Sequence, residues 1–219
     1  MTWISQNLDF IGFALYAHLY LALPAIFFSL IISVPIAYLA NKHPRVREIT
    51  LTSTGLLYTI PSIALFVLIP IIAGVPLRSS LNVHIVLTVY GCALMVRAAA
   101  DAFDSVDKDV LNAAEATGYG PGRLFFGVHL PLAGPAILAG LRVVAVSTIS
   151  LTTVGAVLGI KSLGSLFTDG FQRDIVPEIL TGLVLTMALA FLIDFLLVAI
   201  GKLVMPFDRK PRKLQGARA

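Results

Sequence analysis

The chain has 219 residues, of which 58% are hydrophobic and 13% are charged. Soluble domains carry about 25% charged residues, so this composition excludes an ordinary soluble protein and predicts an all-α polytopic membrane protein of one domain. The single cysteine, Cys92, excludes an intrachain disulfide and a cysteine-rich metal site. The net charge of +4 does not indicate nucleic-acid binding, because the basic residues mainly flank apolar segments.

Five apolar segments follow one another along the chain, and a membrane-spanning helix needs about 20 such residues. The segments span approximately residues 15–40, 52–73, 83–100, 132–160 and 179–204. Prolines inside them are compatible with spans, because neighbouring groups satisfy the freed backbone. We therefore predict a transmembrane domain over residues 15–207 within the lipid bilayer, with an extracytoplasmic segment at 1–14 and a basic cytoplasmic tail at 208–219.

The Lys and Arg residues are distributed unequally between the connections on the two sides of the membrane. The first loop carries Lys42, Arg45 and Arg47. If that loop is cytoplasmic, 13 of the 16 basic residues lie on its side, counting Arg97 and Arg142 near helix ends, and 11 lie there without those two. The other side receives three residues, namely Arg78, Lys161 and Arg173. The positive-inside rule then predicts five spans, with the N-terminus outside and the C-terminus inside.

The chain shows no catalytic constellation. It lacks a Walker loop, a GxSxG elbow and an HExxH helix, and its four scattered histidines do not have metal-ligand spacing. Asp194 is the main acidic residue inside a span and is therefore a functional candidate, but we interpret it as a structural partner of Arg142 or of a backbone donor. No enzymatic activity, catalytic residue, cofactor or metal site is expected.

The polar stretch from residue 107 to residue 131, which we call the elbow, interrupts the apolar pattern. Asp109 is predicted to cap a helix that begins at Val110. Ala113 and Ala114 leave a slim helical surface that fits a groove on a partner. Gly118 and Gly120 permit a positive φ, so the chain can reverse direction there. The alternative is an amphipathic loop on the membrane surface, which needs neither this glycine spacing nor the terminal Leu-Pro.

The elbow resembles the EAA signature of bacterial ABC-importer permeases. That signature is Glu-Ala-Ala, three residues, Gly, nine residues, Ile, one residue and Leu-Pro. Here the same spacing joins Asn112-Ala113-Ala114, Gly118, Val128 and Leu130-Pro131. Two positions depart from the signature: Asn112 occupies the position of the usual Glu, and Val128 that of Ile. Asn112 leaves the details of the ATPase contact open. Glu115, three residues on, is not taken as a replacement for the missing Glu. The resemblance implies a cytoplasmic coupling helix at about 107–126, with these coupling residues: Asp109, Asn112, Ala113, Ala114, Glu115, Gly118, Arg123, Leu130 and Pro131.

Residues 15–207 are also similar to the glycine betaine/carnitine/choline permease subfamily. The segments that carry this similarity are YTIPSIALFVLIP, the elbow with the span after it, GIKSLGSLFTDGF and the last span. The resemblance implies a type I ABC importer in the bacterial cytoplasmic membrane. Its partners would be cytoplasmic ABC ATPase subunits, an extracytoplasmic substrate-binding protein and a second copy of the permease or a homologous one. ATP hydrolysis would then take place on a separate subunit.

The cargo that this subfamily implies is a quaternary-ammonium osmoprotectant. Such a cation is held elsewhere by aromatic rings, and we assign Tyr58, Pro61, Ser62 and Tyr90 to the translocation path, with helix packing as the alternative role of the tyrosines. A permease for another small solute, such as an amino acid or related amine, remains an alternative. A small channel or scaffold is a further alternative of a different class, but it would not explain the elbow.

Overall fold

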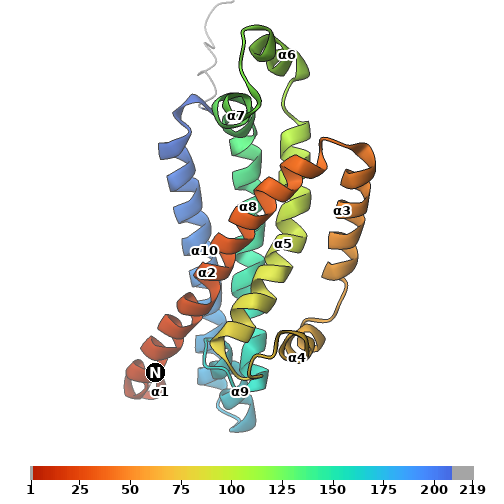
Figure 1. Ribbon diagram of the computed structural model, residues 1–219. Coiled ribbons are helices and arrows are strands. Elements are labelled where there is room, and N and C mark those ends of the chain that lie inside the picture. The colour runs from red at the N-terminus through yellow and green to blue at the C-terminus, as the bar shows by residue number, and fades with distance from the viewer. Residues whose placement is uncertain (1, 209–219) are drawn as a thin grey trace, which may run out of the picture.

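A computed structural model describes residues 2–208 (Figure 1). All regular elements in this range are helical, as the composition predicts. They are α1 (Thr2–Gln6), α2 (Leu8–Ala40), α3 (Pro44–Tyr58), α4 (Ser62–Ala73), α5 (Ser80–Asp104), α6 (Lys108–Ala116), α7 (Pro121–Leu124), the π-helix η1 (Phe125–His129), α8 (Leu130–Thr152), the 3₁₀-helix η2 (Thr153–Leu158), α9 (Gly164–Gln172), α10 (Val176–Val204) and the 3₁₀-helix η3 (Pro206–Asp208). The predicted basic tail lies, apart from Asp208, outside the described residues.

Four helical stretches of residues 2–208 are long and apolar enough to cross a membrane. They are α2, α5, the run from α7 to η2 (Pro121–Leu158) and α10. The pair α3–α4 passes the same test only when its two helices are taken together, and it is bent by 108°. The all-α polytopic fold is therefore confirmed, with four spans, or five if the bent pair is one broken span.

The break between α3 and α4 differs from the prediction of one continuous segment over residues 52–73. α3 ends at Tyr58, and Pro61 forms the N-cap of α4. A residue before a proline is pushed away from the α conformation, so Ile60 cannot continue the helix. The backbone groups at this break lie at span depth, where an irregular backbone is tolerated only beside protein or a water-filled cavity.

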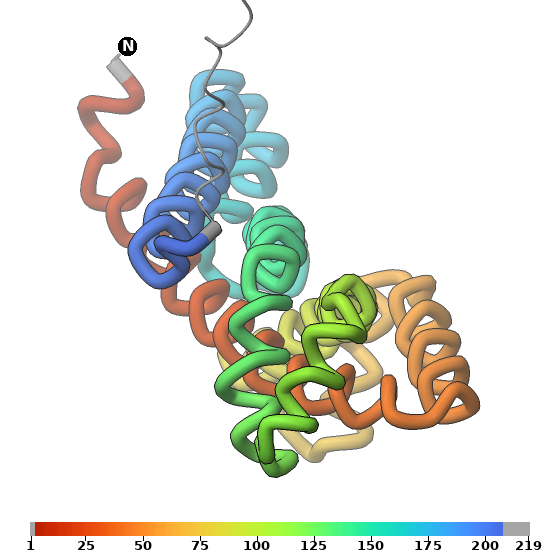
Figure 2. The backbone as a smooth tube through the Cα atoms, turned by 90° about the horizontal axis from the view of Figure 1, so that it is seen from above, coloured from red at the N-terminus to blue at the C-terminus, as the bar shows by residue number. Residues whose placement is uncertain are grey.

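The helices pack with α2 on one side of a row formed by α10, α8, α5 and α3, as Figure 2 shows from above. The main apolar core joins α2, α5 and α8 through Ile26, Ala37, Val96, Ala99, Ile137 and Leu141. On the side of α8 away from this core, the side chains are exposed. We call this surface the open face and define it on α8 by Ala139, Val143, Val146 and Ser150.

The two arginines that the charge count places near helix ends differ in their depth. Arg142 is in the middle of α8, and Arg97 in α5 donates to the carbonyl oxygen of Leu51 at 3.4 Å. The interpretation of Arg142 as a residue near a helix end is therefore wrong, because the count of basic residues has no measure of depth; Arg97 lies in the last third of α5. Six of the other basic residues counted on the first side are described, and they belong to the α2–α3 connection, the elbow and the last turn of α10, at one end of the molecule; Arg78, Lys161 and Arg173 belong to the connections next to α4 and α9 at the other end (Figure 1).

The connection after η2 packs closely through Gly164, the first residue of α9. A Cβ atom at this position would overlap the carbonyl oxygen of Thr153 and lie 2.7 Å from the Thr153 Cα. We expect Gly164→Ala to destabilise the protein by about 1–3 kcal/mol, the usual cost of overpacking, and to lower its melting temperature in detergent. Gly12→Ala is the matched control, because an added Cβ there meets nothing within 4 Å. Equal melting temperatures for the two variants would contradict this packing.

Candidate functional site

The elbow stands clear of the helix bundle. α6 lies beyond the end of α5, at the same end of the molecule as the α2–α3 turn and the C-terminal end of α10 (Figure 1). None of its residues is buried, and Leu111 packs partly against the main core. The helix therefore presents most of its surface, including Asn112 and Glu115, to the outside.

α6 begins at Lys108, two residues earlier than predicted. The Asp107 carboxylate caps it by accepting a hydrogen bond from the backbone N–H of Asp109 at 2.8 Å. The prediction that Asp109 caps a helix beginning at Val110 is therefore wrong. Buried Val106 fixes the chain just before Asp107, which makes Asp107 the first residue free to cap. Asp109 lies in the first turn, where its negative charge interacts favourably with the helix dipole.

The end of α6 depends on Gly118. Its φ of +89° is left-handed, its N–H donates to the carbonyl of Glu115 at 2.9 Å, and the N–H of Tyr119 donates to the carbonyl of Ala114 at 3.2 Å. This pair of bonds is a Schellman motif, for which glycine is the preferred residue. Of the two glycines that permit a positive φ, only Gly118 adopts one: the φ of Gly120 is −71° and its backbone is extended, as is usual before a proline.

The turn after α6 is held together by its own side chains. The guanidinium of Arg123 lies over the ring of Tyr119, 4.9 Å from its centroid, a cation–π geometry. Leu124 is buried, and its N–H donates to the carbonyl of Gly120 at 2.8 Å. Arg123, predicted as a coupling residue, therefore shapes the elbow while its own side chain stays exposed.

The chain returns to the bundle through the π-helix η1, a form of helix that is frequent at functional sites. Its Phe125 ring lies 4.3 Å from the ring of Tyr38 in α2, measured between centroids. His129 Nε2 lies 3.1 Å from the carbonyl oxygen of Phe103 in α5, and the rings of Phe103 and His129 meet nearly edge to face. This aromatic cluster joins the elbow to both α2 and α5. Leu130 and Pro131 then begin α8.

A polar cluster ties the α2–α3 turn to the end of α5, next to the elbow. The Nη2 of Arg47 lies 3.1 Å from Asp101 and 2.8 Å from Asp104. The side-chain amide of Asn41 donates to the carbonyl of Ala100 at 2.8 Å and to Asp104 at 3.0 Å. We call this cluster and the aromatic cluster together the elbow root.

Sequence reasoning missed the elbow root. Asp101 and Asp104 are three residues apart on one helix, so they share a face and follow a basic loop earlier in the chain. That pattern was a usable signal for the polar cluster. The aromatic cluster draws on α2, α5 and η1, which are distant in sequence, and no local pattern links them.

Three of the predicted path residues meet at the break between α3 and α4. Tyr58, Ser62 and Tyr90 line a cavity of about 230 Å³. The Tyr90 hydroxyl donates to the carbonyl of Ile60, and the rings of Tyr58 and Tyr90 meet edge to face at 5.9 Å. Pro61 caps α4 and does not line this cavity.

Further cavities continue from this one along the open face of α8. The cavity at Tyr58 shares Ser147 with a second cavity of about 390 Å³. The second cavity shares Ala139 and Arg142 with a third, which lies between α8 and α10 nearer the elbow. The shared residues place the three cavities in a row along α8, from the helix break toward the end that carries the elbow, and we call this row the α8 track.

An ion pair lies in the middle of the α8 track. Arg142 Nε and Nη2 donate to the two Asp194 carboxylate oxygens at 2.6 and 2.8 Å, a bidentate geometry. The structural interpretation of Asp194 as a partner of Arg142 is confirmed. The side chains remain 41% and 26% exposed, so the pair lies at the surface of this chain and at the depth of a span.

Removing only one member of this pair leaves an uncompensated charge at span depth. We expect Arg142→Gln to lower the melting temperature of the detergent-purified protein and its amount in the membrane. Arg142→Gln combined with Asp194→Asn should recover most of both, because two amides hydrogen-bond without a net charge. A double variant that is less stable than the single one would contradict this account.

Comparisons with known proteins agree with this architecture. The family described as binding-protein-dependent transport system inner membrane component matches residues 25–206. A solved structure of the MetNI methionine ABC transporter in an inward-facing conformation has a TM-score of 0.79 at 21% identity, covering 91% of this chain and 98% of that one. An amino acid ABC transporter structure has a TM-score of 0.70 at 15% identity, covering 94% and 97%. These likenesses concern the fold.

Curated relatives extend the similarity to sequence. The ergothioneine transport permease/ergothioneine binding protein EgtU of Helicobacter pylori is 34% identical over 77% of this chain, which spans 30% of that protein's length. The osmoprotectant import permease protein OsmW of Salmonella typhimurium is 28% identical, covering 89% and 92% of the two chains. The carnitine transport permease protein OpuCB of Listeria monocytogenes is 26% identical, covering 100% and 96%. The chain therefore belongs to the binding-protein-dependent inner membrane components, the permease subunits of ABC importers.

Proposed function

We propose that α6 is the coupling helix that docks into a cytoplasmic ABC ATPase. The observation that supports this best is its geometry: the helix has no buried residue and is joined to the bundle at its two ends. Asp109, Asn112, Ala113, Ala114 and Glu115 form the docking surface. Gly118 and Arg123 shape the turn, and Leu130-Pro131 passes the movement into α8.

The chain works in an assembly. ATP is hydrolysed on separate ATPase subunits, and a binding protein delivers the solute from outside, as the family description implies. A second copy of this permease, or a homologous one, closes the α8 track on the open face. Movement of the ATPases then drives the pair of permeases between inward-open and outward-open arrangements by rigid-body motion.

The elbow end faces the cytoplasm in this proposal. The 11-to-3 distribution of basic residues supports that orientation, which leaves the N-terminus outside and the C-terminus inside. Residues 1–14 are then extracytoplasmic, residues 15–207 form the translocation domain and residues 208–219 are a cytoplasmic tail. The family's inner-membrane location agrees with this placement.

The cargo that we propose is a small quaternary-ammonium solute such as glycine betaine, choline or carnitine. Relatives carry osmoprotectant, carnitine and choline in their names. The cavity at the helix break also suits such a cation: the C-terminal end of α3 is the negative end of a helix dipole, and Tyr58 and Tyr90 offer aromatic rings. Ergothioneine and amino acids are the second candidates for the cargo, because EgtU and the amino acid transporters carry these solutes in their names.

Gly118→Val tests the coupling role. A left-handed φ costs a residue with a Cβ about 1–2 kcal/mol, and the end of α6 should distort. We expect the full transporter to lose most solute uptake and most stimulation of ATP hydrolysis by the loaded binding protein, while the permease still inserts. Gly120→Ala is the control, because its φ of −71° suits any residue and a Cβ there meets nothing within 4 Å. Normal uptake in the valine variant would remove α6 from the coupling mechanism.

The cargo class is tested on the cognate binding protein. We expect glycine betaine, choline or carnitine to raise its melting temperature at micromolar concentration, and the same ligand to drive uptake by the complete transporter. Ergothioneine and methionine are measured beside them as representatives of the second candidates. Stabilisation by ergothioneine or an amino acid alone would replace the proposed cargo class and leave the coupling proposal intact.

A further inference from the structure

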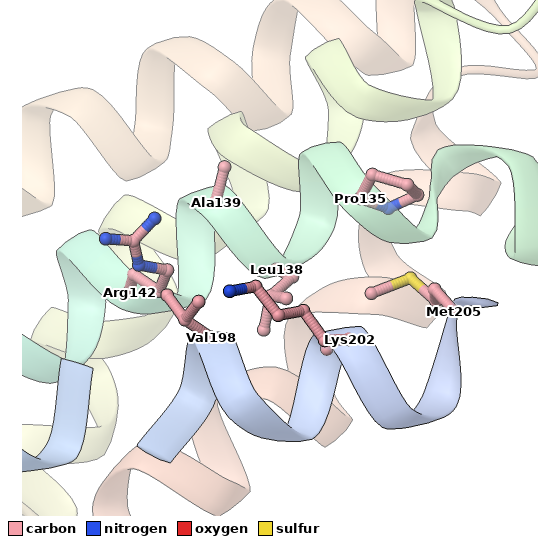
Figure 3. Close-up of a pocket in the computed structure, with 8 residues that line it drawn as sticks. Pro135, Leu138, Ala139, Arg142, Val198, Lys202 and Met205 are labelled. Atoms are coloured by element: carbon pink, nitrogen blue, oxygen red, sulfur yellow. The ribbon is translucent and has the colours of Figure 1, made fainter. Parts of the chain in front are cut away.

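The last cavity of the α8 track is a groove of about 440 Å³ between α8 and α10, within the range of about 300–1,000 Å³ usual for small-ligand sites. Its apolar wall comes from Pro135, Leu138, Val198 and Met205. Arg142 and Lys202 are its charged lining residues. Figure 3 shows the Lys202 side chain extending from α10 toward α8, with its ammonium beside Leu138.

The groove carries an excess of positive charge. Arg142 is paired with Asp194. Lys202 has no carboxylate within 4.0 Å in the part of the chain whose side chains are described. The three groups therefore sum to one uncompensated positive charge beside an apolar wall. Arg142 also keeps 41% of its side chain exposed, although its Nε and Nη2 are both engaged.

This arrangement does not suit a surface covered by lipid tails. Charged side chains within spans normally face a bundle interior or a water-filled cavity. The groove opens on the face of α8 that carries exposed Ala139, and it continues into the neighbouring cavity at Ser147. A hydrated path along α8 accounts for the exposure of the ion pair, and Lys202, in the last turn of α10, stands at the end of that path.

The lining also decides which part of a solute the groove recognises. A trimethylammonium group is attracted to aromatic rings, but the lining of this groove has none. A carboxylate is attracted to an ammonium and a guanidinium, and hydrogen bonds between charged groups are about twice as strong as neutral ones. The two sites therefore prefer opposite charges. The cavity at Tyr58 and Tyr90 suits the cationic end of a solute, and the groove at Lys202 suits its anionic end.

We propose that the groove between α8 and α10 is a carboxylate subsite of the path, in which Lys202 and the exposed part of Arg142 bind the anionic end of a zwitterionic solute on its way out. The inference rests on the proposed transport function and deepens it: the path distinguishes zwitterions from simple cations. Lys202 and Met205 lie near the C-terminal end of α10, so the subsite lies at the end of the track nearer the elbow.

The first experiment measures uptake of radiolabelled glycine betaine and choline by the complete transporter with Lys202→Gln. The two solutes share a trimethylammonium group, and choline has no carboxylate. We expect glycine betaine uptake to fall about 10-fold, as the loss of one charged hydrogen bond predicts, choline uptake to stay within about twofold, and Lys202→Arg to restore the ratio. Arg45→Gln is the control, because it removes an exposed positive charge elsewhere at the same end. An equal fall for both solutes, or no change for either, overturns the subsite.

A second measurement does not depend on the cargo. Ala139→Cys in a Cys92→Ser background places one thiol beside the groove, and its reaction with a sulfonate-bearing methanethiosulfonate is compared with that of a trimethylammonium-bearing one. We expect the anionic reagent to react several-fold faster and Lys202→Gln to abolish the difference. No reaction with either reagent, or a sulfonate reaction blocked only in vesicles containing phosphatidylglycerol, assigns the groove to a partner helix or a lipid headgroup and overturns the proposal.

The two measurements separate the two possible failures. If the unsubstituted transporter imports neither glycine betaine nor choline, the proposed cargo class is wrong, and the preference for the sulfonate reagent alone decides whether the groove takes an anion. If import is normal and the preference is absent, the carboxylate subsite is wrong and the transport function stands.

Discussion

The elbow root is the contact on which the rest of the molecule depends, because a force applied to α6 reaches the spans only through the two ends of the elbow. One end continues α5, where Arg47 binds Asp101 and Asp104. The other end enters α8, where His129 contacts the Phe103 carbonyl. Together with the ring contact between Tyr38 of α2 and Phe125 of η1, these contacts hold α2, α5 and α8 together at one end, so displacement of α6 moves the three helices as one body.

The packing below the root keeps that body rigid. Gly91 of α5 leaves no room for a side chain beside Ser29 of α2, and Gly140 of α8 leaves none beside Ala98 of α5. Such close approach through small residues is how helices associate in a membrane, where lipid tails remove the usual hydrophobic drive. Interiors this tightly packed transmit strain, and movement at the elbow therefore becomes a tilt of whole helices.

Much of this architecture was predictable from local patterns. The apolar runs predict the spans, and the spacing of Gly118 predicts the reversal after α6, since its left-handed φ strongly favours glycine. The N-cap of α6 is Asp107 and not the predicted Asp109, because the burial of Val106 decides where the helix begins. The α8 track joins side chains far apart in sequence, such as Tyr58 and Ser147, and only packing brings them together.

Arg142 lies on the helix that joins the elbow to the α8 track. It lies 12 residues beyond Leu130 in a single helix, which at about 1.5 Å per residue is about 18 Å from the elbow. A charged pair at this depth normally faces water or protein, which agrees with the proposed place of this face on the path or against a second permease. Because one continuous helix bears both the elbow connection and this pair, a tilt imposed at the elbow also displaces the charges that line the track. In the proposed coupling mechanism, the elbow root and the single helix α8 are therefore enough to link α6 to the α8 track.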